Sequence, residues 1–127
     1  MIAVDTSALV AILEQEPDAG LYAEALEADP APVLSTANLI ELQIVMRYRR
    51  GAVGRPLIER LMEQASIEPI PVSVEQARLA ADAHARFGAL NFGDSFAYAL
   101  AQERDVPLLF KGDDFTRTDI RKAVNAS

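Results

Sequence analysis

Short apolar runs alternate with longer helical segments along this chain, and this alternation constrains the fold more than any other feature. The apolar runs are typical of buried strands, which we place at residues 2–4, 33–34, 67–72 and 106–110. The alanine-rich and amphipathic segments predict helices over residues 8–15, 19–28, 37–50, 56–65 and 74–87, and a last helix from a cap at Asp94 or Ser95 to about residue 104. Such alternation favours a three-layer α/β/α domain around a central, mainly parallel sheet. Pro69 and Pro71 weaken the third strand, which we therefore place at a sheet edge.

The size and composition are those of one compact domain, taken here as residues 1–127. With 127 residues, 50% of them hydrophobic, the chain can bury a sizeable core. The absence of cysteine excludes thiol nucleophiles and zinc–cysteine sites, and the single histidine, His84, cannot form a multi-histidine metal site. No uncharged stretch is long enough to span a bilayer, and no basic region precedes the first apolar run, so we expect a cytoplasmic protein.

Charge is distributed unevenly along the chain. The net charge of −7 argues against a purely electrostatic grip on nucleic acid or on an anionic membrane. The first 46 residues contain acidic residues but no lysine or arginine, whereas several arginines gather within residues 47–60. These arginines are either a solvated helix end and loop or a patch that contacts phosphate groups.

Aspartates directly follow two of the predicted strands. Asp5 follows the first strand, at the edge where a parallel sheet gathers its ligands. Asp113 and Asp114 come just after the last predicted strand. Each position also has an ordinary structural interpretation, a helix N-cap for Asp5 and a polar turn for the other two.

Two further acids lie on predicted helices. Glu41 has the apolar helical neighbours Ile44 and Tyr48, so it projects from a largely apolar face and needs a partner, unless it lies at the rim of that face. An arginine is the ordinary partner for such a group. A glycine loop delivers Asp94 to the first turn of an apolar helix, where aspartate is also a preferred cap.

One functional interpretation covers all of these acids. If their segments meet at the carboxyl edge of the sheet, their mutual repulsion requires a cation, and an all-oxygen site suits Mg²⁺ or Mn²⁺. The converging residues would be Asp5, Glu41, Asp94 and one of Asp113 and Asp114. A receiver-like Mg²⁺-binding signalling domain is an alternative, although it needs an acid pair after the first strand, and here the pair follows the last.

Four blocks of sequence carry these acids: IAVDTSA at residues 2–8, TANLIE at 36–41, NFGDS at 91–95 and LLFKGDDFTRTDI at 108–120. In this order and spacing, the blocks resemble the four acidic motifs of the PIN-domain ribonucleases. They most resemble the VapC toxins of bacterial toxin–antitoxin pairs. The resemblance covers essentially the whole chain and implies a single PIN domain.

The resemblance also implies which acids act in catalysis and hold the metal: Asp5, Glu41, Asp94 and Asp114. Asp114 fits the fourth motif best, and Asp113 is the alternative. We expect Asp5 and Asp94 to bind an ion directly. Glu41 and Asp114 are expected to bind through water, to hold a second ion or to accept a proton from water.

Three more polar residues match the family motifs. Thr6 and Ser7 match the residues that steady the first acid and the water shell of the metal. Asp119 matches a recurring acid near the C-terminus. We include all three, with Asp113, among the residues expected to help bind the cofactor.

The resemblance further implies a divalent-metal-dependent endoribonuclease that acts on RNA, a homodimer, and a cognate antitoxin that blocks the site. A PIN-like module that binds RNA or protein without cutting is an alternative, which the intact set of acids argues against. Because an acidic centre repels RNA, basic residues at its rim must steer the backbone, and the candidates are Arg47, Arg49, Arg50, Lys111 and Arg117.

An inhibitor of an acidic site should insert a cation, so an antitoxin arginine could replace the metal between two carboxylates. The apolar helices near the N-terminus either pack entirely in the core or form a groove that binds such a partner. The leucines concerned include Leu9, Leu13, Leu21 and Leu26. Tyr48 and Tyr98 either stack on bases or, as is more usual for aromatics at helical spacing, pack in the core. We interpret His84 as a packed or half-exposed side chain without a role in proton transfer.

Overall fold

The computed structural model describes residues 1–88 and 90–124. Its sheet contains the strands β1 (Ala3–Val4), β2 (Val33–Ser35), β3 (Glu68–Ile70) and β4 (Leu108–Leu109), in the order β3-β2-β1-β4. All three strand pairs are parallel, and Ala3 lies opposite both Val33 and Leu108. The parallel sheet predicted from the sequence is confirmed, and the proline-containing strand β3 lies at an edge as expected.

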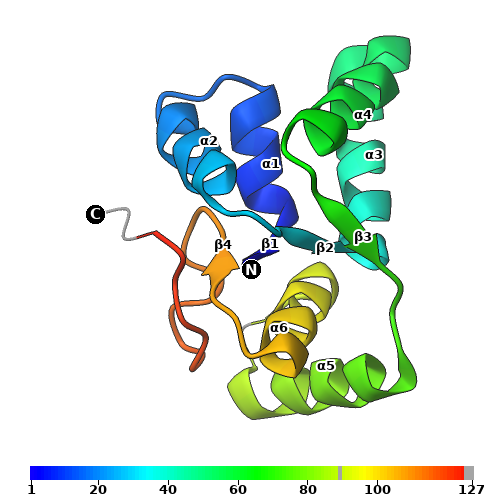
Figure 1. The fold of residues 1–127 in the computed structure, drawn as a ribbon. Helices are drawn as coiled ribbons and strands as arrows, with labels where there is room; N and C mark the ends of the chain where they lie inside the picture. The colour runs from blue at the N-terminus through cyan, green and yellow to red at the C-terminus, as the bar shows by residue number, and fades with distance from the viewer. Residues whose placement is uncertain (89, 125–127) are drawn as a thin grey trace.

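Helices cover both faces of this sheet, so the three-layer architecture is also confirmed (Figure 1). One side holds α1 (Thr6–Leu13), α2 (Ala19–Ala28), α3 (Thr36–Arg50) and α4 (Gly54–Gln64), with the short 3₁₀ helix η1 (Gly51–Val53) between the last two. The other side holds α5 (Val74–Phe87) and α6 (Phe92–Arg104). A separate apolar cluster fills each layer: Leu9, Leu26 and Leu42 belong to the first, and Ala83 and Leu100 to the second.

The helix ends follow local capping chemistry. The side chain of Ser35 accepts the backbone N–H of Ala37 at 3.2 Å and so begins α3 directly after β2. Gly88 ends α5 with φ at 65°, a left-handed conformation that glycine adopts without strain. The predicted loop at residues 88–93 includes residue 89, and the predicted domain includes residues 125–127. These four positions lie outside the described residues.

The start of α6 differs from the prediction. Neither Asp94 nor Ser95 is the cap, because Asn91 holds that position and its side chain accepts the N–H of Asp94 at 2.8 Å. Asparagine caps a helix as well as aspartate does, and it lies at the right distance from this N–H. The carboxylate of Asp94 is thereby left out of the cap and stands in the first turn of the helix.

Helix α3 turns a different face to the core than expected. Its buried apolar side chains are Leu42 and Met46, whereas Ile44 is 64% exposed and Tyr48 is 94% exposed. The face that carries Glu41 is apolar as predicted but is not buried, and Tyr48 is not the core aromatic that its helical spacing favoured. The contiguous apolar residues of this helix form two stripes, and only one of them packs against the sheet.

The core interpretation is confirmed for Tyr98, and His84 is exposed rather than packed. Tyr98 is 4% exposed and packs edge-on against Phe87, as expected of a core aromatic. His84 is exposed on α5.

In the described part of the chain, each helix is too short or too polar to cross a bilayer.

Candidate active site

The carboxyl edge of the sheet is where the predicted acids gather. Because α1 follows β1 and α3 follows β2, their N-terminal ends lie at this edge, and the first turn of α6 meets them there. A cavity of about 390 Å³ opens between these ends and the loop after β4. Its acidic lining consists of Asp5, Glu16, Glu41, Asp94 and Asp114.

Asp5 is held rigidly at the end of β1. It is 4% exposed, and its Oδ2 accepts hydrogen bonds from both the backbone N–H, at 3.0 Å, and the hydroxyl of Ser7. The hydroxyl oxygen of Ser7 in turn accepts the backbone N–H of Lys111 at 3.0 Å, which ties the loop after β4 to this acid. Asp5 is thus the N-cap of α1 and also lines the cavity. Among the described residues its Oδ1 has no hydrogen-bond partner.

Asp94 enters the cavity from the first turn of α6. It is 6% exposed, and its Oδ2 also has no hydrogen-bond partner among the described residues. An oxygen buried without a partner is costly, because water that would otherwise solvate it has been removed. Asp5 and Asp94 therefore each present one buried, unsatisfied carboxylate oxygen.

Glu41 approaches from α3. Its Oε1 accepts a hydrogen bond from the side-chain amide of Asn38 at 3.4 Å. The structure does not contain the expected arginine partner, since no ion pair of the described residues includes Glu41. The carboxylate instead lies over Gly93, where a Cβ atom would overlap it. The missing side chain of Gly93 is what admits Glu41 to this position.

The electrostatics of the cavity show that these acids act on one another. The pKa of Asp5 is raised to about 6, chiefly by burial and to a lesser extent by the charges of Glu41 and Asp114, against the lowering effect of the Ser7 hydrogen bonds. Burial raises the pKa of Asp94 to about 7, helped by the charges of Asp5, Asp114 and Glu41. Within residues 1–88 and 90–124, no three acidic or histidine side chains form a compact cluster that would hold an ion as they stand. Like-charge repulsion disfavours the close approach of several carboxylates.

Comparison with known proteins places the chain in a family. The model of the PIN domain family matches residues 2–121. The chain belongs to the PIN domain family. Ribonuclease VapC42 of Mycobacterium tuberculosis is similar to this PIN domain, with 45% identity over 128 residues that cover 94% of this chain and 97% of the relative.

Two solved structures share the fold of this PIN domain. VapC20 of Mycobacterium tuberculosis, described as a sarcin-ricin loop cleaving toxin, superposes with a TM-score of 0.77 at 18% identity, over 94% of this chain and 96% of that one. VapBC2 from Rickettsia felis, bound to a DNA fragment from its promoter, gives a TM-score of 0.75 at 16% identity and covers 96% of each chain. The receiver-like and the non-cleaving alternatives are not favoured by these comparisons.

The other residues of the predicted site of this PIN domain divide into two groups. Thr6 and Ser7 line the cavity. Asp114 also lines it, whereas Asp113 lines a separate hollow beside Tyr22 and Lys122. Of the two aspartates, Asp114 is therefore the one at the cavity.

Asp119 does not line this cavity, contrary to the prediction. Its carboxylate accepts hydrogen bonds from Tyr98 and Gln102, and it lies 3.7 Å from the guanidinium of Arg86. Tyr98 and Gln102 belong to α6, and Arg86 belongs to α5. Asp119 therefore ties the segment after β4 to the far layer of helices, a contact between distant parts of the chain that the motif does not reveal.

The predicted basic residues differ in whether they form ion pairs in the folded structure. Lys111 is bound by Glu16 and Asp18, with its ammonium 2.8 Å from the Asp18 carboxylate, and these contacts hold its pKa well above the ordinary value. Arg50 forms a two-pronged pair with Glu14. Arg49 is the predicted base that lines the acidic cavity without an ion pair among the described residues.

Three residues that position the cavity acids were not singled out from the sequence: Asn38, Asn91 and Gly93. The spacing of Asn91 three residues before Asp94 is a local capping signal that could have been found. The roles of Asn38 and Gly93 depend on contacts between α3 and α6, which no local pattern records.

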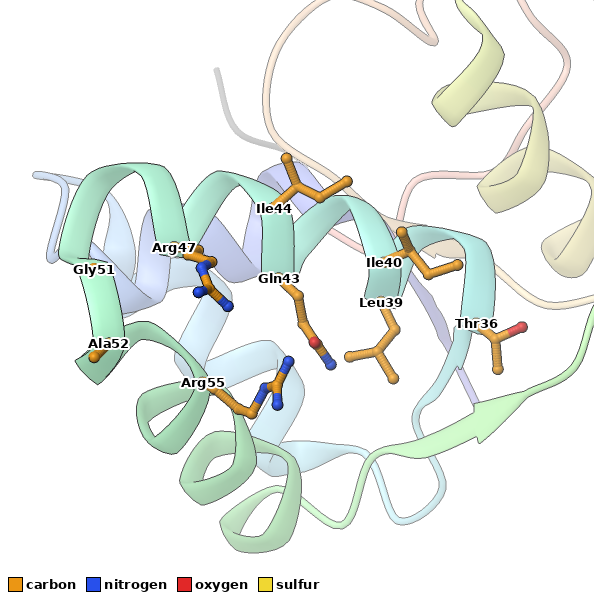
Figure 2. A pocket seen from close by; sticks show the side chains of 9 residues that line it. All are labelled: Thr36, Leu39, Ile40, Gln43, Ile44, Arg47, Gly51, Ala52 and Arg55. Atoms are coloured by element: carbon orange, nitrogen blue, oxygen red, sulfur yellow. The ribbon is translucent and has the colours of Figure 1, made fainter.

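A second hollow lies on the other side of α3, against α4, with a volume of about 560 Å³. Figure 2 shows Leu39, Gln43 and Arg55 pointing into the space between the two helices. The predicted groove near the N-terminus is mostly core, since Leu9 and Leu26 are fully buried. The hollow between α3 and α4 combines apolar and basic lining residues.

The raised pKa values of Asp5 and Asp94 predict how metal-free stability changes with pH. Both acids ionise at about 6 to 7 when folded but at 3.8 when unfolded, so between these values the folded state binds more protons. Stability should therefore be greatest below this window and fall as pH rises through it. We expect a lower Tm at about pH 8 than at about pH 5 in chelator, and a smaller fall in Asp94→Asn. An equal fall in both proteins would show that Asp94 does not cause it.

Proposed function

We propose that this PIN domain is an endoribonuclease toxin of the VapC type, which hydrolyses RNA phosphodiester bonds with a bound Mg²⁺ or Mn²⁺ ion. The observation that carries the proposal is the convergence of acids from four separate segments on one cavity, with two buried carboxylate oxygens left without partners. The 45% identity to a relative named Ribonuclease VapC42 supports RNA as the substrate.

The residues of the cavity fit a small divalent cation. Carboxylate oxygens are the ligands that Mg²⁺ and Mn²⁺ prefer, and a cation would satisfy the free oxygens of Asp5 and Asp94 while relieving the repulsion between them. We assign these two acids as direct ligands, and Glu41 and Asp114 as groups that hold the water shell or a second ion. When bound, the cation supplies an acidified water and neutralises charge on the phosphate.

The protein's own groups then have separate tasks. Ser7 keeps Asp5 in one orientation, because it donates both its N–H and its hydroxyl to the same carboxylate oxygen. Glu41 and Asp114 are less enclosed than Asp5 and can accept a proton from the attacking water. The negative cavity excludes RNA phosphate unless a cation or an arginine at its rim compensates.

A cleavage assay tests this function. Purified protein is incubated with RNA in Mg²⁺, in excess chelator, and in chelator to which Mn²⁺ is then restored. The proposal requires cleavage in the first and third conditions only. Cleavage that persists in chelator would refute the metal-dependent mechanism, and stable phosphorylation of an aspartate by a small phosphodonor would favour a signalling role instead.

Arg49 should contribute to RNA binding rather than to chemistry. It lines the cavity beside Glu41, whereas the ammonium of Lys111 is occupied by two acids. We expect Arg49→Ala to raise KM for RNA about threefold to tenfold with little change in kcat, and the difference to shrink at high salt. Arg60→Ala on the exposed side of α4 is the control. A fall in kcat alone would contradict a binding role.

We also propose an antitoxin partner and a homodimer. The open hollow between α3 and α4 has Leu39 and Ile40 among its apolar lining residues and Arg47 and Arg55 among its charged ones, which fits an amphipathic helix carrying acidic residues. A second segment of the same partner could place an arginine among the cavity acids. Copurification with a coexpressed antitoxin tests the antitoxin proposal.

The homodimer is tested by sedimentation, which should give a mass of about twice 13.8 kDa.

A further inference from the structure

Asn38 lies behind the wall of the acidic cavity and contacts the segments that carry its acids, although it does not line the cavity itself. It lies in the first turns of α3 and is fully buried. Its side-chain amide donates to the backbone carbonyl of Gly93 at 3.0 Å and to Oε1 of Glu41 at 3.4 Å. Its backbone carbonyl accepts the hydroxyl of Thr6 at 3.2 Å.

These three contacts join the segments that carry three of the acids. Thr6 follows Asp5, Gly93 precedes Asp94, and Glu41 lies one helical turn beyond Asn38 itself. Both N–H groups of the amide are used, one on α6 and one on the Glu41 carboxylate. Asn38 therefore links α3 to α1 and to α6 at the point where the acids converge.

We propose that Asn38 is a positioning residue of the nuclease site, which holds the Glu41 carboxylate against the first turn of α6 and so sets the spacing of Glu41 and Asp94. This inference rests on the proposed metal-dependent nuclease function. Repulsion between the acids pushes the carboxylate of Glu41 outward toward solvent, and the amide of Asn38 opposes that movement. Loss of this hydrogen bond should leave Glu41 free to swing away from the position needed for metal and water.

The chemistry of the position favours an amide over the alternatives. A carboxylate of the same shape would face the carbonyl of Gly93 and the carboxylate of Glu41 with acceptors only, and would repel both. An apolar side chain would leave the buried carbonyl of Gly93 without this donor. The amide's own Oδ1 has no partner among the described residues, so an asparagine at this position leaves one buried oxygen unsatisfied.

The chain contains a matched control. Gln76 on α5 is 2% exposed, donates from Nε2 to Glu103 Oε1 at 2.9 Å, and likewise leaves its own Oε1 without a partner in the described structure. It is thus a second buried amide that holds a glutamate, but it belongs to the α5–α6 layer and does not line the acidic cavity. Truncating it should disturb folding in the same way without touching the site.

The test compares Asn38→Ala with Gln76→Ala in the full chain. We measure kcat and KM for RNA cleavage in Mg²⁺, the Tm in chelator, and the rise in Tm on adding Mn²⁺. Both variants should lose Tm in chelator. Only Asn38→Ala should lose kcat, by about tenfold to a hundredfold at unchanged KM, and only Asn38→Ala should show a smaller Mn²⁺-induced rise in Tm.

Each outcome decides the question. If kcat and the Mn²⁺-induced shift of Asn38→Ala stay within about twofold of those of Gln76→Ala, Asn38 is a structural residue only. If Asn38→Ala does not fold, Asn38→Ser, which keeps a shorter donor, is compared with Gln76→Ser by the same measurements. If the wild type binds Mn²⁺ but cuts no RNA, the proposed function fails while the metal-induced shift still tests the positioning role.

Discussion

Asp94→Asn is expected to lower RNA cleavage about a hundredfold to a thousandfold, the usual size of effect when one electrostatic group of a site is lost. The same change should raise Tm in chelator, because burial and three neighbouring acids oppose the ionised carboxylate. Among the described residues, Oδ2 of the Asp94 carboxylate is buried and accepts no hydrogen bond. A gain of about 1 kcal/mol would raise Tm by roughly 4 °C in a domain of this size. Thermal melting and a cleavage assay measure the two effects.

The control for this prediction is Asp82→Asn, an exposed aspartate on α5 outside the cavity. It should change neither cleavage nor the response to metal. Titration with Mn²⁺ should raise the Tm of the wild type and of Asp82→Asn but hardly that of Asp94→Asn. If Asp94→Asn melts well below the wild type in chelator, Asp94 has a structural role and the metal site is misassigned.

Gly93→Ala is expected to lower kcat about tenfold to a hundredfold while leaving Tm unchanged or higher. The new methyl group would occupy the position of the Glu41 carboxylate, which must move away. That carboxylate is the end of a flexible side chain, so its displacement costs little stability. Alanine is favoured over glycine within a helix by about 1 kcal/mol, which offsets the cost further. Activity should therefore fall without a loss of stability.

Gly20→Ala on α2 provides the matched control. A Cβ at Gly20 would meet no atom within 4 Å, so this variant gains the same helical preference without displacing anything. Its Tm should rise slightly and its kcat should equal that of the wild type. Wild-type kcat in Gly93→Ala would show that the position of Glu41 does not matter to the reaction. A large loss of Tm would show that the contact with Glu41 is structural.

The fold was predictable because its signals are local. Alternating apolar runs and helical segments indicated the parallel sheet, and Pro69 indicated its edge. The placement of Asp5 at the cavity was also predictable, since it directly follows a buried strand, and parallel strands end at a common edge. The start of α6 was misplaced because Asn91, Asp94 and Ser95 are all good capping residues, and propensity alone cannot choose among them.

The partners of the charged and polar side chains were decided by the tertiary structure. Lys111 looked like a base for RNA until the fold brought Glu16 and Asp18 to it. Asp119 looked like a site acid until the fold gave it Tyr98 and Gln102 as donors.

Local periodicity and capping follow from neighbours within a turn or two of chain, so strands, helices and the order of the acids can be inferred from residue types alone. The approach of Glu41 over Gly93 and the hydrogen bond from Asn38 to Gly93 join residues more than fifty positions apart. The side of α3 that packs is likewise set by its contacts with other helices and with the sheet. Such contacts exist only once the layers have packed, because burial and side-chain shape select them and the neighbouring sequence does not.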